Sequence, residues 1–161
     1  MNLRLQNLSP PVYQRQATSR DEFALARLWR RAWSSANPAV RVVAPLTHWQ
    51  ERVRAEFGPP CVTLILERDQ SLLGFMVLDP ARNYLHQLFV APQVQSQGLG
   101  GALVLEICLS HFPDGWTLHV ATSNQRARQF YARCGLVEEE VDLNPQTGRE
   151  RVLCRWTPRE C

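Results

Sequence analysis

Glycines with the spacing of an anion-binding turn stand past the middle of this chain, at Gly98, Gly100 and Gly101. They lie between an apolar strand pattern, residues 84–90, and a helical pattern, residues 102–112. The first turn of a helix leaves backbone N–H groups unpaired and carries a partial positive charge, so an anion can dock where glycines let the backbone approach. The pattern predicts a phosphate-binding turn made of Gln95, Ser96, Gln97, Gly98, Leu99, Gly100 and Gly101.

Glycines of this spacing also occur wherever a strand turns tightly into a packed helix, so the turn needs a second indication. No Gly-Lys-Ser or Gly-Lys-Thr follows, which excludes a nucleoside-triphosphate loop. A dinucleotide fingerprint is excluded as well, because its third glycine and the acidic residue at the end of the next strand are missing. The anion must therefore belong to another kind of ligand.

Two stretches resemble the signature motifs of GNAT-type N-acetyltransferases. The run Leu88-Phe89-Val90-Ala91-Pro92, followed by Gln95-x-x-Gly98-x-Gly100, is similar to the motif with which this family binds the pyrophosphate of acetyl-CoA. The family's second motif, Asn-x-x-Ala-x-x-Phe-Tyr in a helix ending at a glycine, is matched by Asn124, Ala127, Phe130, Tyr131, Cys134, Gly135 and Leu136. With Arg15-Gln16-Ala17-Thr18 as the opening strand, the resemblance runs over residues 12–158.

The resemblance implies an N-acetyltransferase with acetyl-CoA as co-substrate and a primary amine, expected to be a small molecule, as acceptor. The amine would attack directly within a ternary complex. Gln95 and Gln97 replace arginines of many relatives, so backbone amides would carry most of the phosphate binding. Asn124 matches a cofactor contact of the family, although an Asn before a helix is also an ordinary N-cap. We expect no metal, because no ligand-like spacing joins the cysteines to His48, His86, His111 or His119.

Acetyl transfer needs a deprotonated amine, a polarised carbonyl and a proton for the departing thiolate. By resemblance, Tyr131 stands near the CoA sulfur as general acid, and a phenol with a pKa of about 10 suits that role. The resemblance also implies that the main chain of Leu88, Phe89 and Val90 pairs with the pantetheine arm, with the Val90 amide polarising the acetyl carbonyl. From the residues alone, this stretch is a buried strand and Tyr131 packs beside Phe130.

His86 is the candidate general base, because it precedes Leu88 by two residues and an imidazole with a pKa of about 6.5 accepts a proton at neutral pH. A lone histidine in a strand can equally be structural. Tyr84, Glu67 and Asp79 are rivals, and a water relay would need no single base.

Aromatic side chains on two early helices are the candidates for acceptor binding. Trp29 and Trp33 share a helical face, and His48 with Trp49 opens the next helix. This aromatic wall could hold a small amine, but the same stripe could be core beneath the sheet. Cys134, which lies within the second motif, occupies a packing position and is not expected to be a nucleophile.

The order of the elements predicts an α/β (α+β) chain and agrees with the GNAT fold that the resemblance implies. Strands are expected at 12–17, 61–67, 72–78, 84–90 and 116–122, and a closing hairpin at 137–144 and 151–156. Helices are expected after capping boxes at Ser19–Glu22 and Thr47–Gln50, at 102–112, and from Asn124 to Gly135. We therefore expect a mixed central sheet of about six to seven strands with about four helices on both faces. The resemblance implies that this sheet is splayed between the fourth and fifth strands.

Composition limits the domain count and the partners. A chain of 161 residues, 45% hydrophobic and 20% charged, is the size of one domain, and we expect a single GNAT domain at 12–161. Residues 1–11 are expected to be a flexible N-terminal leader. Five cysteines without a Cys-x-x-Cys pair favour a reducing cytoplasm. A net charge of +3 without clustered lysines predicts no nucleic acid, and short apolar runs predict no membrane. Arg126, Arg128 and Arg133 are interpreted as a solvated face of a helix, and some of these arginines could contact the CoA phosphates.

Three alternatives to a small-molecule acetyltransferase stay open at this point. The acceptor could be a protein, through its N-terminal amine or a lysine. The donor could carry another acyl group, such as succinyl. The chain could also be a non-catalytic acyl-CoA-binding sensor, and its oligomeric state is open, a homodimer included.

Overall fold

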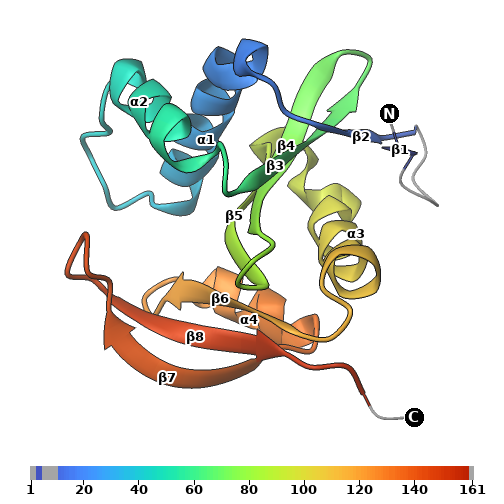
Figure 1. Ribbon diagram of the computed structural model, residues 1–161. Coiled ribbons are helices and arrows are strands. Elements are labelled where there is room, and N and C mark those ends of the chain that lie inside the picture. Colours follow the sequence, from blue (N-terminus) through green and yellow to red (C-terminus); the bar gives the residue numbers. More distant parts are fainter. Residues whose placement is uncertain (1–2, 5–10, 160–161) are drawn as a thin grey trace.

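The computed structural model describes residues 3–4 and 11–159. In this part of the chain an 8-stranded mixed sheet has the order β1-β2-β3-β4-β5-β6-β8-β7 (Figure 1). The strands are β1 (Leu3–Arg4), β2 (Tyr13–Gln16), β3 (Val62–Arg68), β4 (Ser71–Asp79), β5 (Tyr84–Val90), β6 (Trp116–Ala121), β7 (Val137–Leu143) and β8 (Glu150–Trp156). The helices are α1 (Glu22–Ala36), α2 (Leu46–Glu56), α3 (Leu99–Glu106), which continues as a π-helical turn at Ile107–His111, and α4 (Gln125–Arg133). All the expected strands and helices are present.

The leader expected over residues 1–11 lies mostly outside the described residues. Of that segment, Leu3 and Arg4 form β1, where Leu3 pairs with Gln14 of β2. This short strand is the one that the sequence did not predict. Val12 directly precedes β2 and is fully buried, so the core begins next to β2.

Helices cover both faces of the sheet (Figure 1). α1 packs on α2 and contacts β4 and β5, whereas α3 contacts β5 from the opposite face. In α1 the residues Leu25, Leu28, Trp29 and Ala32 are buried, and their spacing of three and four places them on one face of the helix. No helix within the described residues is long and apolar enough to cross a membrane.

Both predicted capping boxes are wrong in detail. The box before α1 joins Thr18 to Asp21, whose carboxylate accepts the Thr18 backbone N–H at 2.8 Å. Arg15 of β2 holds the same carboxylate through two bonds of 2.8 Å, which fixes the box at this position. α2 starts at Leu46 after Pro45, and the proline at the N-cap offers no side-chain acceptor.

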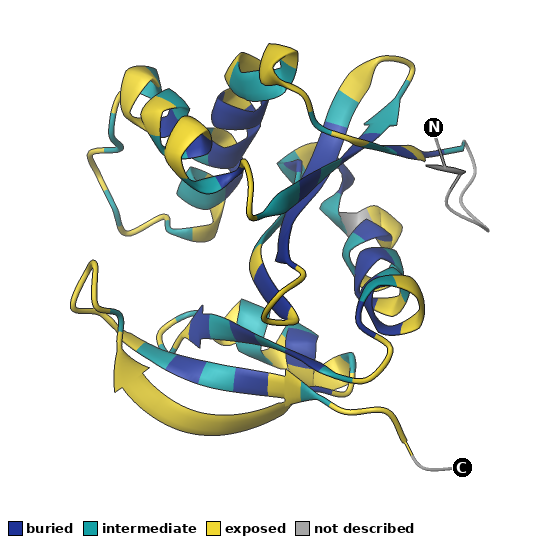
Figure 2. Ribbon diagram, in the orientation of Figure 1, coloured by how far each residue is buried: buried dark blue, intermediate teal, exposed yellow. Residues whose placement is uncertain are grey.

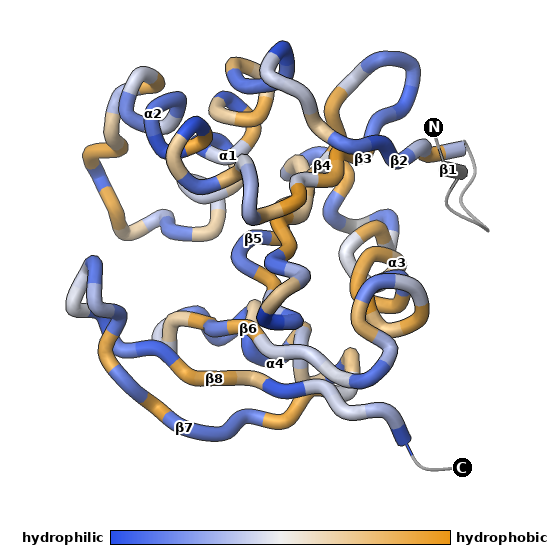
Figure 3. The backbone as a smooth tube through the Cα atoms, viewed as in Figure 1, coloured by the Kyte–Doolittle hydropathy of each residue, from blue (hydrophilic) through white to orange (hydrophobic). Residues whose placement is uncertain are grey.

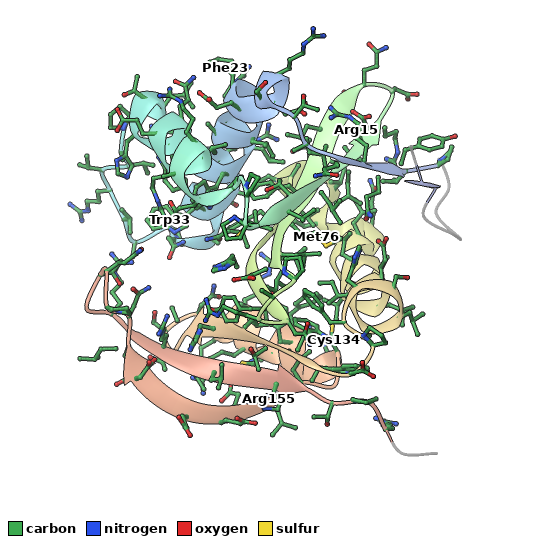
Figure 4. The ribbon with its side chains drawn as sticks, in the orientation of Figure 1. Arg15, Phe23, Trp33, Met76, Cys134 and Arg155 are labelled. Carbon is green, nitrogen blue, oxygen red and sulfur yellow. The ribbon has the colours of Figure 1, made fainter. Side chains whose placement is uncertain are left out.

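The core surrounds β4, the centre of the sheet. Phe75, Met76 and Val77 are consecutive and all 0% exposed, so both faces of this strand are covered. Figure 2 shows β4 largely buried and β7 exposed throughout, and Figure 3 shows hydrophobic residues along β4 and α3. Met76 lies at the centre of the molecule, between α1 and α3 (Figure 4).

Two hairpins confirm the turn predictions. Asp69 and Gln70 join β3 to β4 with φ of 50° and 63°, the left-handed pair of a tight hairpin. The closing hairpin of β7 and β8 also forms, with β8 inserted between β6 and β7. The sequence predicted the hairpin but not which of its strands would pair with β6.

The sheet is open between β5 and β6. These neighbours are parallel, and their register contains a single pair, Tyr84 with Thr117. Beyond Tyr84 the two strands diverge, which is visible in Figure 1. The predicted splay between the fourth and fifth strands of the sequence, here β5 and β6, is thus confirmed.

Candidate active site

A cavity of about 640 Å³ lies where β5 and β6 diverge. Its wall combines both strands with the start of α3, with α4 and with the C-terminal end of α1. The volume is typical of small-molecule sites, which span about 300 to 1,000 Å³. The open seam of the sheet is therefore also a candidate binding site.

The start of α3 has the features of an anion site. Gly98 precedes the helix with φ of 77°, and a Cβ there would meet nothing within 4 Å. The Ala102 N–H donates to the Gly98 carbonyl at 3.1 Å, so the amides of Leu99, Gly100 and Gly101 have no partner within α3 itself. No acidic residue in the first turn offsets the positive end of the helix. Unpaired donors and positive potential thus meet at one edge of the cavity.

Most residues predicted to bind the cofactor reach this cavity. Its lining includes Leu88, Phe89, Val90, Gln95, Gly98, Gly100, Gly101, Asn124 and Tyr131. Leu99 instead buries its side chain in the core, and the Gln97 side chain accepts a hydrogen bond from Arg68 at 3.2 Å. The side chain of Ser96 lies outside the described part. Neither Leu99 nor Gln97 is among the residues that line the cavity.

The outer edge of β5 offers backbone groups to the cavity. Phe89 pairs with Phe75 and Leu88 with Met76 in the antiparallel ladder with β4, and the Ala91 N–H donates to the Leu73 carbonyl at 2.7 Å. Because such ladders alternate, the N–H and C=O of Phe89 also point to β4, whereas those of Leu88 and Val90 point to the seam. Gln95 already uses one of these groups, donating from Nε2 to the Val90 carbonyl at 3.1 Å. The Val90 amide and both Leu88 groups remain for a ligand.

Glycine at position 100 lets α3 approach α4. A Cβ on Gly100 would lie 3.2 Å from Cζ of Phe130, closer than ordinary contact. Phe130 and the buried Tyr131 meet edge to face, with ring centroids 5.0 Å apart. The glycine therefore serves the packing as well as the anion site, and both interpretations of the motif apply.

Tyr131 and Asn124 both line the cavity from α4. Burial raises the pKa of the Tyr131 phenol above its ordinary value, so the hydroxyl keeps its proton at neutral pH. The Asn124 Oδ1 accepts the Ala127 N–H at 3.1 Å, which confirms the N-cap interpretation. Asn124 therefore caps the N-terminus of α4 and also lines the cavity.

His86 owes its position to a β-bulge. The register of β4 and β5 shifts so that Val77 pairs with Gln87 and Leu78 with Leu85, which leaves His86 unpaired. Bulges of this kind redirect a side chain. The imidazole lines the cavity, is about one third exposed, and has Nε2 3.8 Å from Oδ2 of Asp79. The carboxylate thus lies beside the imidazole at the margin of the cavity.

His119 of β6 is a cavity residue to which the sequence analysis gave no role. Its Nδ1 lies 2.5 Å from the hydroxyl of Tyr84, so the two side chains join β5 to β6 at their point of contact. The Tyr84 hydroxyl is thereby hydrogen-bonded to His119. Glu67 lies away from the cavity and forms an ion pair with Arg15, with an N–O distance of 3.0 Å. Two of the rivals to His86 for the base lie beside it: Asp79, with Oδ2 3.8 Å from Nε2, and Tyr84, with ring centroids 4.7 Å apart.

Acid should destabilise the fold through His119. Burial, with a further effect of Arg151, lowers the pKa of His119 below 6.5, so the folded protein resists protonation that the unfolded chain accepts. The resulting stability is present above about pH 6.5 and is lost as pH falls through the folded pKa. We expect the melting temperature to fall between pH 7 and 5, less steeply in His119→Gln. Exposed His48→Gln is the control, and equal slopes in all three proteins would contradict the assignment.

The four residues predicted to bind the acceptor do not line the cavity. Trp29 and Trp49 are buried against each other with ring centroids 5.0 Å apart, and the half-buried Trp33 lies 5.6 Å from Trp49. His48 is exposed on α2. Figure 4 shows Trp33 at the end of α1 that faces α2. The aromatic stripe is core between the helices, and the acceptor-wall interpretation is corrected accordingly; the end of α1 lines the cavity with Ala32, Ser35 and Ala36 instead.

Replacing Trp29 by alanine should therefore cost stability and spare ligand affinity. The side chain is 1% exposed, and such truncations cost about 3 to 5 kcal/mol. Phe23→Ala is the matched control, because Phe23 lies on the same helix but is 51% exposed, and a change within about 0.5 kcal/mol is expected there. Urea unfolding measures both. A stable Trp29→Ala protein would show that the cluster is not core.

The charged residues of the cavity lining are both cations, Arg126 and Arg133 of α4. The third arginine of this helix, Arg128, points elsewhere and pairs with Glu138 at 2.8 Å. No Asp or Glu is found among the described residues of the lining. The solvated-face interpretation holds for Arg128, whereas its two neighbours give the cavity a positive rim suited to an anionic ligand.

Comparison with known proteins agrees with this geometry. The family model described as the acetyltransferase (GNAT) family matches residues 23–136, more than half of the chain. The chain belongs to this family and is an acyltransferase. No protein of curated function matches it.

Solved structures share the fold at low sequence identity. Apo YjaB from Escherichia coli is 20% identical with a TM-score of 0.73, covering 92% of this chain and 99% of its own. PaiA N-acetyltransferase from Thermoplasma acidophilum, in complex with coenzyme A, is 18% identical with a TM-score of 0.69, covering 90% and 99%. A chimera of the spermidine N-acetyltransferase SpeG from Vibrio cholerae and hSSAT is 18% identical with a TM-score of 0.65, covering 91% and 94%.

Proposed function

We propose that this acyltransferase moves an acetyl group from acetyl-CoA to the primary amine of a small molecule, by direct attack in a ternary complex. The observation that carries the proposal is the continuity of one cavity from the start of α3 to the open edge of β5. A ligand with a diphosphate at one end and amides along its arm matches both. The complex of PaiA with coenzyme A supports this choice of donor.

In the proposed complex the diphosphate lies on the amides that open α3, next to Gly98 and Gly100. The pantetheine arm runs along β5 and pairs with the outward groups of Leu88 and the amide of Val90, as an added strand would. Arg126 and Arg133 on the rim supply positive charge to the phosphates. Tyr131 then stands on the opposite wall, across the arm.

Each chemical requirement of the transfer has a candidate group. His86, assisted by Asp79, accepts a proton from the amine, directly or through water. The Val90 amide polarises the carbonyl as negative charge develops on its oxygen. The amine nitrogen forms the new bond, the thioester C–S bond breaks, and Tyr131 donates its proton to the departing thiolate.

The acceptor is proposed to be a small amine without a second positive charge. Ala32, Ser35 and Pro38 also line the cavity, whose volume of about 640 Å³ suits a compact molecule beside the cofactor arm. A polyamine needs carboxylates for its other ammonium groups, and the described lining contains none. A reducing cytoplasm suits this chemistry and the free thiols of Cys61, Cys108, Cys134 and Cys154.

A thiol-release assay with purified protein and acetyl-CoA tests the proposal. The panel contains monoamines, amino acid amides, spermidine, and peptides with a free N-terminus or a lysine. We expect release with a compact amine, and spermidine should be no better than a monoamine. Faster release with peptides would favour a protein acetyltransferase, and succinyl-CoA in place of acetyl-CoA reports the acyl preference. Saturable acetyl-CoA binding without release by any amine would favour the sensor.

A further inference from the structure

Three side chains with metal-binding chemistry meet at the margin of the cavity. The ligand atoms of Cys61, Asp79 and His86 all lie within 4.8 Å of one another. Cys61 is half-buried, Asp79 is 7% exposed, and His86 is open to the cavity. A thiol, a carboxylate and an imidazole in one cluster are a donor set typical of zinc.

The sheet register brings these residues together. Val62 of β3 pairs with Leu78 of β4, which places Cys61, just before β3, opposite Asp79 at the end of β4. The bulge in β5 then directs His86 back toward Asp79, with Nε2 to Oδ2 at 3.8 Å. The donors thus come from two adjacent strands, β4 and β5, and from the residue just before β3.

The spacing is close to what a single ion requires. With bond lengths of about 2.0 to 2.3 Å to zinc, donor atoms in a tetrahedral site lie roughly 3.3 to 3.6 Å apart. The 3.8 Å between His86 and Asp79 needs only a small side-chain rotation. Asp79 also has a fixed second contact, since its Oδ1 accepts the Ala81 N–H at 3.2 Å. That bond orients the carboxylate, as partners behind metal ligands commonly do.

We propose that Cys61, Asp79 and His86 bind one divalent zinc ion beside the cavity. Three protein ligands leave the fourth position to water or to a group entering the cavity. The sequence analysis expected no metal because it considered spacing along the chain, which separates these residues widely. Zinc at this site would hold the Nε2 of His86. Where His86 is the base of the proposed function, zinc would therefore slow acetyl transfer.

Arg82 competes for the same carboxylate. Its Nη1 lies 3.9 Å from Oδ2 of Asp79, and its side chain is 63% exposed. An ion pair this exposed is weak, so the arginine can give way to a metal, but its charge still repels the cation. Arg82→Gln should therefore raise metal affinity severalfold, a gain that loss of folding cannot imitate. Arg155→Gln, which removes an arginine paired with Glu139 on β7, is the charge-matched control.

Cobalt titration of the full chain, without acetyl-CoA or amine, tests the site. We expect saturable binding of one ion with a thiolate-to-cobalt charge-transfer band, displaced by zinc. The band should disappear in Cys61→Ser and persist in Cys134→Ser, whose thiol is also half-buried but lies at the end of α4. Asp79→Asn and His86→Gln should weaken binding at least about tenfold, since each removes one of three ligands. Circular dichroism checks that every variant is folded.

An unchanged band in Cys61→Ser, or no saturable binding by the unaltered chain, would overturn the metal site. An affinity equal in Arg82→Gln and the unaltered chain would also count against it. Zinc inhibition of thiol release is a separate measurement. Binding without inhibition would refute the role of His86 as base and leave the metal site standing.

Discussion

Gly98→Glu should reduce acetyl-CoA affinity by at least about 100-fold, which corresponds to about 2.7 kcal/mol. The new carboxylate would lie where the proposed diphosphate binds, and like charges brought together in a binding site cost several kcal/mol. Space is not the obstacle, because a Cβ at Gly98 would touch nothing within 4 Å. The loss would therefore report charge at the start of α3. Isothermal titration calorimetry with acetyl-CoA measures it.

Backbone strain needs its own control, because Gly98 has φ of 77° and any side chain there is disfavoured. Gly148, in the turn between β7 and β8, has φ of 69° and equally open surroundings. Gly148→Glu should lose similar stability but keep its affinity for acetyl-CoA. If Gly98→Glu binds acetyl-CoA normally, the assignment of the diphosphate to this turn is wrong. If both variants lose affinity equally, the effect comes from folding.

Tyr131→Phe should lower kcat by about 100-fold, the usual lower range for loss of a general acid. The ring remains to fill its buried position, so the affinity for acetyl-CoA should change little. Since burial raises the pKa of Tyr131, the phenol stays protonated throughout the neutral range. The alkaline limb of the kcat profile of the unaltered enzyme should therefore not arise from Tyr131. Steady-state kinetics from pH 6 to 9 test both statements.

Tyr13→Phe is the matched control for Tyr131→Phe, because Tyr13 lies on β2 and is 38% exposed. Its kcat should equal that of the unaltered enzyme. A Tyr131→Phe enzyme with unchanged kcat would reduce Tyr131 to a packing residue beside Phe130. Weaker acetyl-CoA binding with unchanged kcat would assign the hydroxyl to the cofactor rather than to the leaving thiolate.

Local motifs predicted those parts of the site that a short segment builds by itself. The glycines from Gly98 to Gly101 specify a strand-to-helix turn through backbone freedom, and this information is contained in the segment. Asn124 and Gly135 likewise mark the two ends of α4, where an N-cap bond and a φ of 93° are found. The element order and the splay followed from strand and helix periods and from the resemblance.

The sequence could not predict contacts between residues that the register of the strands brings together. The meeting of Cys61, Asp79 and His86 depends on a bulge that only the paired strands reveal. The role of His119 depends on its neighbour Tyr84, which comes from another strand. The tryptophans were ambiguous for a different reason. Helical period shows that Trp29 and Trp33 share a face, but not whether that face meets another helix or a cavity.

The single bridge between β5 and β6 gives the centre of this sheet the behaviour of an edge. The peptide hydrogens of Leu88 and Val90 point into the seam, so in the free protein they should exchange with deuterium quickly, although Phe89 between them is shielded by β4. A bound donor with amides of its own would pair with these groups as an added strand does. The sheet would then be continuous across the seam only in the complex, and the parts of the sheet on either side of the seam would unfold together.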